Sequence, residues 1–281
     1  MPVKTVIIPA GGLGTRLLPA TKCTPKEMLP VYDRPVIQFA LDEAVAAGAT
    51  RILLVVGPGK TALRDYLQPD EDLARHLQDK GKHALHEALE STGVGPEVEV
   101  EIVVQDSPRG LGDAVLCCAP HLERTPFGVI LPDDLIFGDP CLLQMARAYT
   151  GGHMVAAQTV APQQVSQYGI FRITGSAIRG PIRASGMVEK PSVAEAPSRI
   201  AAVGRYILDP VVLTRLSMTL PGAGGEVQLT DAIAEDVDTK GLTAFLFDGE
   251  RFDCGCHDGL LSASIVRERQ LRRGNAMAAV G

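Results

Sequence analysis

Residues 3–9, VKTVIIP, and the glycine-rich AGGLG at 10–14 decide the fold of this chain. A β-branched run that closes at a proline and glycines is typical of a buried strand. Residues 35–48, PVIQFALDEAVAAG, begin with proline, repeat apolar residues at helical spacing and end at glycine, so they predict a helix. The run RILLVV at 51–56 predicts the next strand. Strand, helix and strand in this order form a βαβ unit, which favours a parallel sheet with helices on both faces.

The alternation of strands and helices continues along the chain. The pattern predicts further strands at 98–104, 127–131, 153–160, 170–173 and 201–208, a helix from Gly110, helices near Asp209 and Val227, and an exposed helical excursion over 70–91, interrupted at Gly81. Beyond Thr150 the order is less regular, and we expect mixed strands that close over the sheet. We predict an α/β fold with a Rossmann-like, mixed but mostly parallel central sheet flanked by helices. It forms one domain, 1–281, with an N-terminal lobe of about 1–150 and a C-terminal lobe of about 151–281.

Composition and charge exclude several classes of protein. Of the 281 residues 46% are hydrophobic and 21% are charged, as in soluble globular proteins. The net charge of −6 is scattered along the chain, so no broad field attracts nucleic acid or anionic lipid. Apolar runs such as 52–56 are far shorter than the ~20 residues of a membrane helix. The first apolar run stops at Pro9, too short for a signal-peptide core, and we expect a cytoplasmic protein with no nucleic-acid or membrane partner.

The six cysteines contain no C-x-x-C pair, so reduced thiols are the expectation. The alternative to reduced thiols is a zinc site formed by Cys254, Cys256 and His257. A structural zinc site needs paired spacings and a fourth ligand, which this cluster lacks.

Polar chemistry gathers first in residues 9–30, PAGGLGTRLLPATKCTPKEMLP. Glycines at 11, 12 and 14 let the backbone approach a ligand, while Arg16, Lys22 and Lys26 bring cations to the same loop. This combination predicts a triphosphate cradle, although neither a G-x-G-x-x-G nor a Walker pattern is present. The alternative is a plain turn after a strand.

Acidic residues occupy other predicted loops. Asp133 and Asp134 follow a strand at the edge where α/β sheets bind ligands, so one could hold Mg²⁺; capping a turn is the alternative. Asp253, in FDCG, is a second carboxylate in a predicted loop. The alternative to a ligand-binding role is that it only stabilises a turn. Glu189 and Lys190, in VEKP, lie at the end of a predicted strand. The alternative to a binding role is that they form an exposed ion pair.

Together these motifs resemble the sugar-phosphate nucleotidylyltransferases. GLGTRL with PKEMLP carries the signature, and LLPATKCTPKEMLP is similar to the bacterial UTP:glucose-1-phosphate uridylyltransferase branch. Further similar stretches are QDSPRGLGDAVL at 105–116, LPDD at 131–134, QYGI at 167–170, VEKP at 188–191, VGRYIL at 203–208 and EVQLTDAI at 226–233. The resemblance implies a nucleotide-diphospho-sugar transferase fold and Mg²⁺-dependent synthesis of UDP-glucose and pyrophosphate from UTP and α-D-glucose 1-phosphate.

The resemblance also implies roles for individual residues. Arg16, Lys26, Asp133 and Lys190 match catalytic positions; Gly11, Gly12, Gly14, Thr15, Arg16, Lys26, Gln105 and Gly110 match nucleotide contacts; Gly169, Glu189 and Lys190 match sugar-phosphate contacts; and Asp133 and Asp253 match the Mg²⁺ ligands. By the same resemblance, Gln105 matches the position that hydrogen-bonds the uracil edge.

Two residues depart from the branch. Asp113 stands where His is usual, expected near the sugar, and His257 stands where Lys is usual. The first loop also reads AGG, as in thymidylyl relatives. Therefore dTTP or another hexose 1-phosphate, such as galactose 1-phosphate, remains an alternative, as does a nucleotide-sugar-binding homologue without turnover. Relatives commonly form homodimers or homotetramers, for which the apolar stripe of residues 259–273 could serve.

Overall fold

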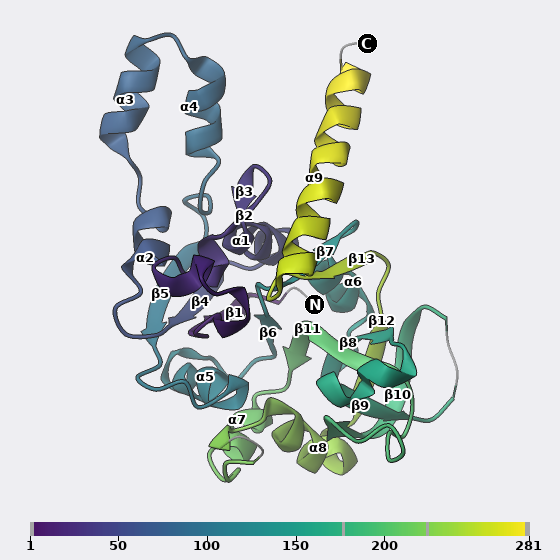
Figure 1. The fold of residues 1–281 in the computed structure, drawn as a ribbon. Helices are drawn as coiled ribbons and strands as arrows, with labels where there is room; N and C mark the ends of the chain where they lie inside the picture. Colours follow the sequence, from purple (N-terminus) through teal and green to yellow (C-terminus); the bar gives the residue numbers. More distant parts are fainter. Residues whose placement is uncertain (1–2, 176–177, 223–224, 279–281) are drawn as a thin grey trace.

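A nine-stranded sheet forms the centre of the computed structural model, which describes residues 3–175, 178–222 and 225–278. The strand order is β5-β4-β1-β6-β11-β8-β12-β10-β9. Its strands are β1 (Thr5–Ala10), β4 (Arg51–Val56), β5 (Glu99–Val104), β6 (Phe127–Ile130), β8 (His153–Thr159), β9 (Gly169–Ile173), β10 (Gly180–Glu189), β11 (Ile200–Leu208) and β12 (Leu242–Leu246). β10 and β11 run against the other strands. The predicted mixed, mostly parallel α/β sheet is confirmed (Figure 1).

Two small ribbons accompany the sheet. They pair β2 (Pro30–Val31) with β3 (Arg34–Pro35) and β7 (Asp134–Phe137) with β13 (Glu250–Asp253). The second ribbon joins the segment after β6 to a segment near the end of the described chain, with Asp134 opposite Asp253. Residues far apart in the sequence therefore meet beside the carboxyl end of β6.

The described residues form helices that lie on both faces of the sheet, as the βαβ pattern predicts, and others that project from the body. They are α1 (Val36–Ala46), α2 (Thr61–Leu67), α3 (Glu71–Asp79), α4 (His83–Glu90), α5 (Leu111–Cys117), α6 (Cys141–Ala148), α7 (Val211–Leu216), α8 (Leu229–Lys240) and α9 (His257–Ala278), with short 3₁₀ turns η1 (Thr15–Leu17), η2 (Ala20–Lys22), η3 (Lys26–Met28), η4 (Ala119–His121) and η5 (Pro162–Gln167). Leu41 of α1 and Met145 of α6 lie in one buried cluster with Ile8. Val115 of α5 and Ile233 of α8 lie in another with Ile7. Neighbouring residues of β1 thus contribute to opposite faces.

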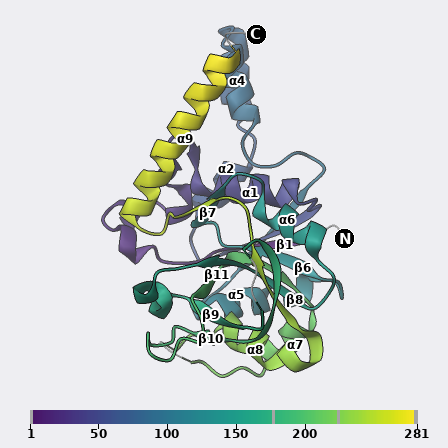
Figure 2. The same cartoon turned by 90° about the vertical axis from the view of Figure 1, so that its right-hand side faces the viewer.

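Two helical arms project from the same side of the body (Figures 1 and 2). One is the predicted excursion, α3 and α4, which turn at Gly81. The other is α9, whose base buries Ala263 against Val36 and Phe252, and whose Arg267 donates two 2.9 Å hydrogen bonds to Asp33. The apolar stripe of α9 therefore packs in part on N-terminal elements, although Leu261 is 61% exposed.

The structure describes all six cysteines as free thiols. Burial raises the pKa of Cys254 to about 12, which favours the protonated thiol over a zinc-binding thiolate. Among the described residues, no helix combines the length and apolar character needed to cross a bilayer.

A buried histidine predicts a pH dependence of stability. His153 is fully buried at the start of β8, with its Nε2 3.6 Å from Oδ2 of the equally buried Asp236. Burial lowers the pKa of His153 below its ordinary 6.5, although Asp236 opposes the shift. Because the unfolded chain takes up this proton first, the free energy of unfolding falls as the pH drops from about 6.5 towards the folded pKa, by at most ~1.4 kcal/mol per pH unit.

Urea unfolding at pH 7.5, 6.5 and 5.5 measures this contribution. His153→Gln should lower the slope of stability against pH in that window, whereas replacement of the exposed His83 by Gln should leave it unchanged. Equal slopes for the wild type and His153→Gln would contradict the assignment.

Candidate active site

The glycine-rich loop after β1 lines a cavity of about 440 Å³ at the carboxyl edge of the parallel strands. Gly14 has a φ of 65°, the left-handed region that glycine enters without strain, and it turns the chain into η1. The lining includes eight residues that the sequence assigns to ligands: Gly11, Gly12, Gly14, Thr15, Lys26, Gln105, Gly110 and Asp133. Loops after β1, β5 and β6 thus supply one cavity, as expected for an open α/β sheet.

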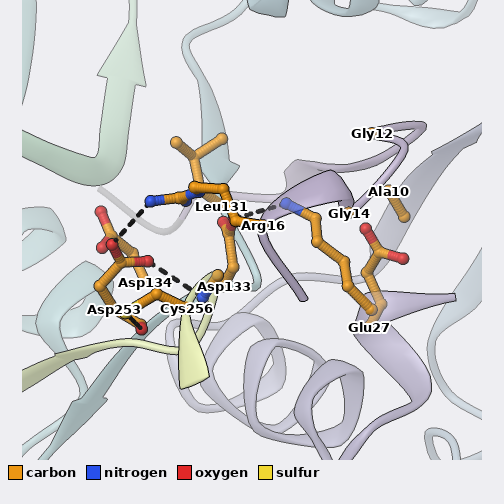
Figure 3. Close-up of polar contacts among 12 residues, drawn as sticks. Ala10, Gly12, Gly14, Arg16, Glu27, Leu131, Asp133, Asp134, Asp253 and Cys256 are labelled. Atoms are coloured by element: carbon orange, nitrogen blue, oxygen red, sulfur yellow. Dashed lines mark hydrogen bonds and ion pairs between the residues drawn. The ribbon is translucent and has the colours of Figure 1, made fainter. Parts of the chain in front are cut away.

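Two ion pairs bring the predicted cations and carboxylates together (Figure 3). Arg16 Nη1 donates to Asp253 Oδ2 at 3.1 Å, and Lys26 Nζ donates to Asp133 Oδ2 at 2.5 Å. Burial opposes the charge on both Lys26 and Asp133, but each charge stabilises the other: the pKa of Lys26 lies above its ordinary value and that of Asp133 below. Both groups therefore stay charged at neutral pH.

The two carboxylates converge on Gly255. A Cβ atom at Gly255 would meet the Arg16 guanidinium first, and it would lie 2.9 Å from Asp253 Oδ1 and 3.0 Å from Asp133 Oδ2, so both carboxylates and Arg16 border this glycine. Among the described residues no three His, Cys, Asp or Glu side chains form an all-protein metal site. Mg²⁺ is usually held by one or two carboxylates together with substrate phosphates and water, so this pair fits a divalent cation shared with a phosphorylated ligand.

The structure separates the two adjacent aspartates. Asp134 Oδ2 accepts a 2.7 Å hydrogen bond from the Gly204 backbone amide, and its Oδ1 pairs with Arg251. Arg251 in turn donates to the Tyr168 hydroxyl at 3.1 Å. Asp134 therefore joins β11 and β13 to the loop after β6, while Asp133 faces the cavity.

Gln105 follows β5 and is 5% exposed. Its Nε2 donates to Asp113 Oδ2 at 2.7 Å and to the Gly110 carbonyl oxygen at 3.2 Å. The other oxygen of Asp113 lies 2.9 Å from Nη2 of Arg109. The hydrogen-bond and ion-pair partners of Asp113 are thus Gln105 and Arg109, and its expected place near the sugar stays a prediction.

The residues predicted for the sugar phosphate form a second group at the end of β10. Glu189 Oε2 accepts from the Thr230 hydroxyl at 2.6 Å, and Glu189 Oε1 lies 3.4 Å from Lys190 Nζ. A Cβ atom at Gly169 would lie 3.2 Å from Glu189 Oε2, so Gly169 borders the same carboxylate. Lys190 has a φ of 45°, which is rare outside glycine and typical of functional sites.

Several contributors are absent from the sequence prediction. Lys60 Nζ donates to the carbonyl oxygens of Ala10 and Gly12 at 2.8 and 2.7 Å and lies 3.5 Å from the fully buried Glu27. Burial raises the pKa of Glu27, and Lys60 offsets this only in part. Lys60 follows β4 in VVGPGK, so its place after the neighbouring strand was a usable signal. Thr230 lies in the EVQLTDAI stretch at 226–233 that carries the resemblance, but the sequence analysis gave it no role.

Two other expected residues lie away from this cavity. Lys22 lines a neighbouring hollow with Lys60 rather than the cavity of the glycine-rich loop. His257 is exposed at the start of α9, next to Cys256 and four residues beyond Asp253.

Comparisons with known proteins agree with this architecture. The chain is 40% identical over 270 residues to UTP--glucose-1-phosphate uridylyltransferase 1 of Streptococcus pyogenes serotype M3, covering 94% of this chain and 88% of the relative. A UTP-bound UGPase from Acinetobacter baumannii superposes with a TM-score of 0.87 at 37% identity, covering 94% and 93% of the two chains. A UDP-glucose pyrophosphorylase complexed with UDP-glucose superposes with a TM-score of 0.83 at 36% identity, covering 95% and 99%.

The sequence profile of the family described as nucleotidyl transferase matches residues 5–269. This range runs from β1 into α9 and includes every residue of both groups described above. The chain therefore belongs to the nucleotidyl transferase family.

Proposed function

We propose that this chain makes UDP-glucose and pyrophosphate from UTP and α-D-glucose 1-phosphate. The observation that carries the proposal is the meeting of Arg16, Lys26, Asp133 and Asp253 beside a glycine-lined cavity, since a triphosphate needs both cations and metal-binding carboxylates. The names of the relatives support the choice of substrates, because they are uridylyltransferases and UDP-glucose pyrophosphorylases.

In this proposal the first cavity holds UTP. Backbone amides of Gly11, Gly12, Gly14 and Thr15 approach its phosphates, while Gln105 and Gly110 face the base. Arg16 and Lys26 pair with the β and γ phosphates that leave as pyrophosphate.

Glucose 1-phosphate binds to the second group of residues, at the end of β10. Glu189 accepts hydrogen bonds from sugar hydroxyls, Lys190 pairs with the phosphate, and Gly169 leaves room beside the Glu189 carboxylate. This assigns the nucleotide to the lobe of about 1–150 and the sugar phosphate to that of about 151–281. Asp253 crosses this division through its pair with Arg16.

The reaction needs no protein nucleophile. An oxygen of the sugar phosphate attacks the α-phosphorus of UTP in line, a P–O bond forms, and the bond to the β-phosphate oxygen breaks as pyrophosphate leaves with its electrons. The attacking oxygen is already ionised at pH 7, so the barrier consists mainly of anion repulsion and orientation. Arg16, Lys26 and Lys190 lower the repulsion by placing positive charge around the phosphates.

Enzymes of this family generally need a divalent metal ion. We propose Mg²⁺, held by Asp133 and Asp253, whose carboxylate oxygens converge on Gly255. When bound it neutralises phosphoryl charge and orients the phosphates. A cytoplasmic location and a homodimer or homotetramer are further proposals; the exposed Leu261 and Ile265 of α9 support the second.

Pyrophosphate release tests the function. The assay crosses UTP, dTTP, ATP, CTP and GTP with the 1-phosphates of glucose, galactose and mannose, with and without Mg²⁺. We expect release with UTP, glucose 1-phosphate and Mg²⁺, and little with other pairs. A preference for another pair would change the substrate assignment. No pyrophosphate release with any pair would favour a binding protein without turnover.

A further inference from the structure

The amide of Gln105 can adopt only one orientation, because a carboxylate lies against it. The two Nε2 protons have two acceptors, Asp113 Oδ2 at 2.7 Å and the Gly110 carbonyl oxygen at 3.2 Å. The opposite orientation would place Gln105 Oε1 against the Asp113 carboxylate, so two acceptors would face each other at hydrogen-bond distance. An ionised carboxylate cannot donate, so it imposes the first orientation.

Asp113 is itself held in place. It is 5% exposed on α5, and its second oxygen lies 2.9 Å from Nη2 of Arg109. Each carboxylate oxygen thus has one donor, and neither needs a hydrogen bond from a ligand.

The remaining polar atom of the amide, Gln105 Oε1, faces the glycine-rich loop. A Cβ atom at Gly11 would lie 3.0 Å from this oxygen, and both residues line the same cavity. At Gln105 the cavity wall therefore presents a hydrogen-bond acceptor, Oε1, to a ligand, while both Nε2 protons are already used within the protein. A base that binds there must supply an N–H group.

We propose that Asp113 is a positioning residue that gives the site its preference for uracil over cytosine. This inference rests on the proposed function, because it takes the cavity to hold the base of UTP. Uracil carries an N3–H donor where cytosine carries a bare N3 acceptor, so Oε1 of Gln105 binds the first and repels the second. Thymine has the same N3–H group, so this contact does not separate UTP from dTTP. The ionised Asp113 carboxylate can only accept hydrogen bonds, so it holds the Gln105 amide in this one orientation.

Equilibrium binding of UTP and of CTP, measured by calorimetry on the full chain, tests the proposal. We expect the wild type to prefer UTP, and Asp113→Asn to lower the ratio of the two affinities ~10-fold, about the value of one hydrogen bond. Asn at 113 is matched in size but can donate as well as accept, so the Gln105 amide is free to turn over. The control is Asp106→Asn, the same change of charge at an exposed position between β5 and α5, and it should keep the wild-type ratio.

A double-mutant cycle separates positioning from a structural role. If Asp113 acts through Gln105, then Asp113→Asn has no further effect on the UTP to CTP ratio in a Gln105→Ala protein. In turnover, Asp113→Asn should raise KM for UTP and leave kcat within about twofold of the wild type. A lower melting temperature and lower kcat with an unchanged UTP to CTP ratio would overturn the proposal.

Failure of this inference and failure of the proposed function give different results. A wild type that releases pyrophosphate from UTP but binds CTP equally well overturns the role of Asp113 alone. A wild type that turns over no substrate pair, yet prefers UTP to CTP in an Asp113-dependent way, supports the role of Asp113 and overturns the proposed function.

Discussion

Lys26→Ala and Asp133→Asn will each lower the turnover of UTP and glucose 1-phosphate by ~10²–10³-fold and leave the fold intact. Lys26 lines the cavity of the glycine-rich loop, and Asp133 is its 2.5 Å partner. Both stay charged at neutral pH, since the pKa of Lys26 is raised and that of Asp133 is lowered despite burial. Lys26→Ala removes a cation that stabilises the departing pyrophosphate. Asp133→Asn removes a carboxylate from the proposed metal site.

Initial rates of pyrophosphate release at saturating substrate and Mg²⁺ measure this loss. Far-ultraviolet circular dichroism and thermal unfolding establish that each variant is folded. The exposed Lys80, on the arm formed by α3 and α4, provides the control: Lys80→Ala also removes one cation but should keep wild-type turnover. Near-normal turnover in a folded Lys26→Ala or Asp133→Asn protein would refute the proposed roles.

The strands and helices of the first half were predictable because their signals are local. β4 has the predicted bounds, and α1 lies within the predicted range 35–48, since proline, glycine and apolar spacing mark both. In the second half β12 was missed, and of β10 only its end at Glu189, in VEKP, was predicted. The sequence of β10, GPIRASGMVE, contains two glycines and a proline, so its strand character arises from pairing with β9 and β12 rather than from propensity.

The candidate site was predictable wherever its residues lie in one motif. The glycine-rich loop and Lys26 are contiguous, but the pairing of Arg16 with Asp253 spans 237 positions and depends on the β7–β13 ribbon. The place of Lys60 after β4 was a usable signal, but the sequence does not show that its Nζ reaches the carbonyl oxygens of Ala10 and Gly12. Asp113 shows the same limit, since its position next to Gln105 requires knowing how α5 follows β5.

Glu43→Ala will lower the free energy of unfolding by ~3–5 kcal/mol, the largest stability effect we expect from a single substitution. Arg205 of β11 is 1% exposed, and its Nε and Nη2 donate three hydrogen bonds of 2.7–2.9 Å to the Glu43 carboxylate of α1. Glu43 also accepts from the Leu142 backbone amide at 2.9 Å. Removing the carboxylate leaves a buried guanidinium without its ion-pair partner, which costs far more than an exposed ion pair contributes.

The same pair supports the loop that carries Asp133. Arg205 Nη1 donates to the carbonyl oxygen of Leu131 at 3.1 Å, two residues before that carboxylate, so Glu43→Ala should lower kcat as well as stability. Urea unfolding gives the free energy, with Arg75→Ala as control because Arg75 and Asp72 form an exposed pair on α3 that should not alter stability measurably. Equal stability of Glu43→Ala and Arg75→Ala would mean that solvent reaches Arg205 and that the pair is not the buried connection between α1, β11 and the Asp133 loop.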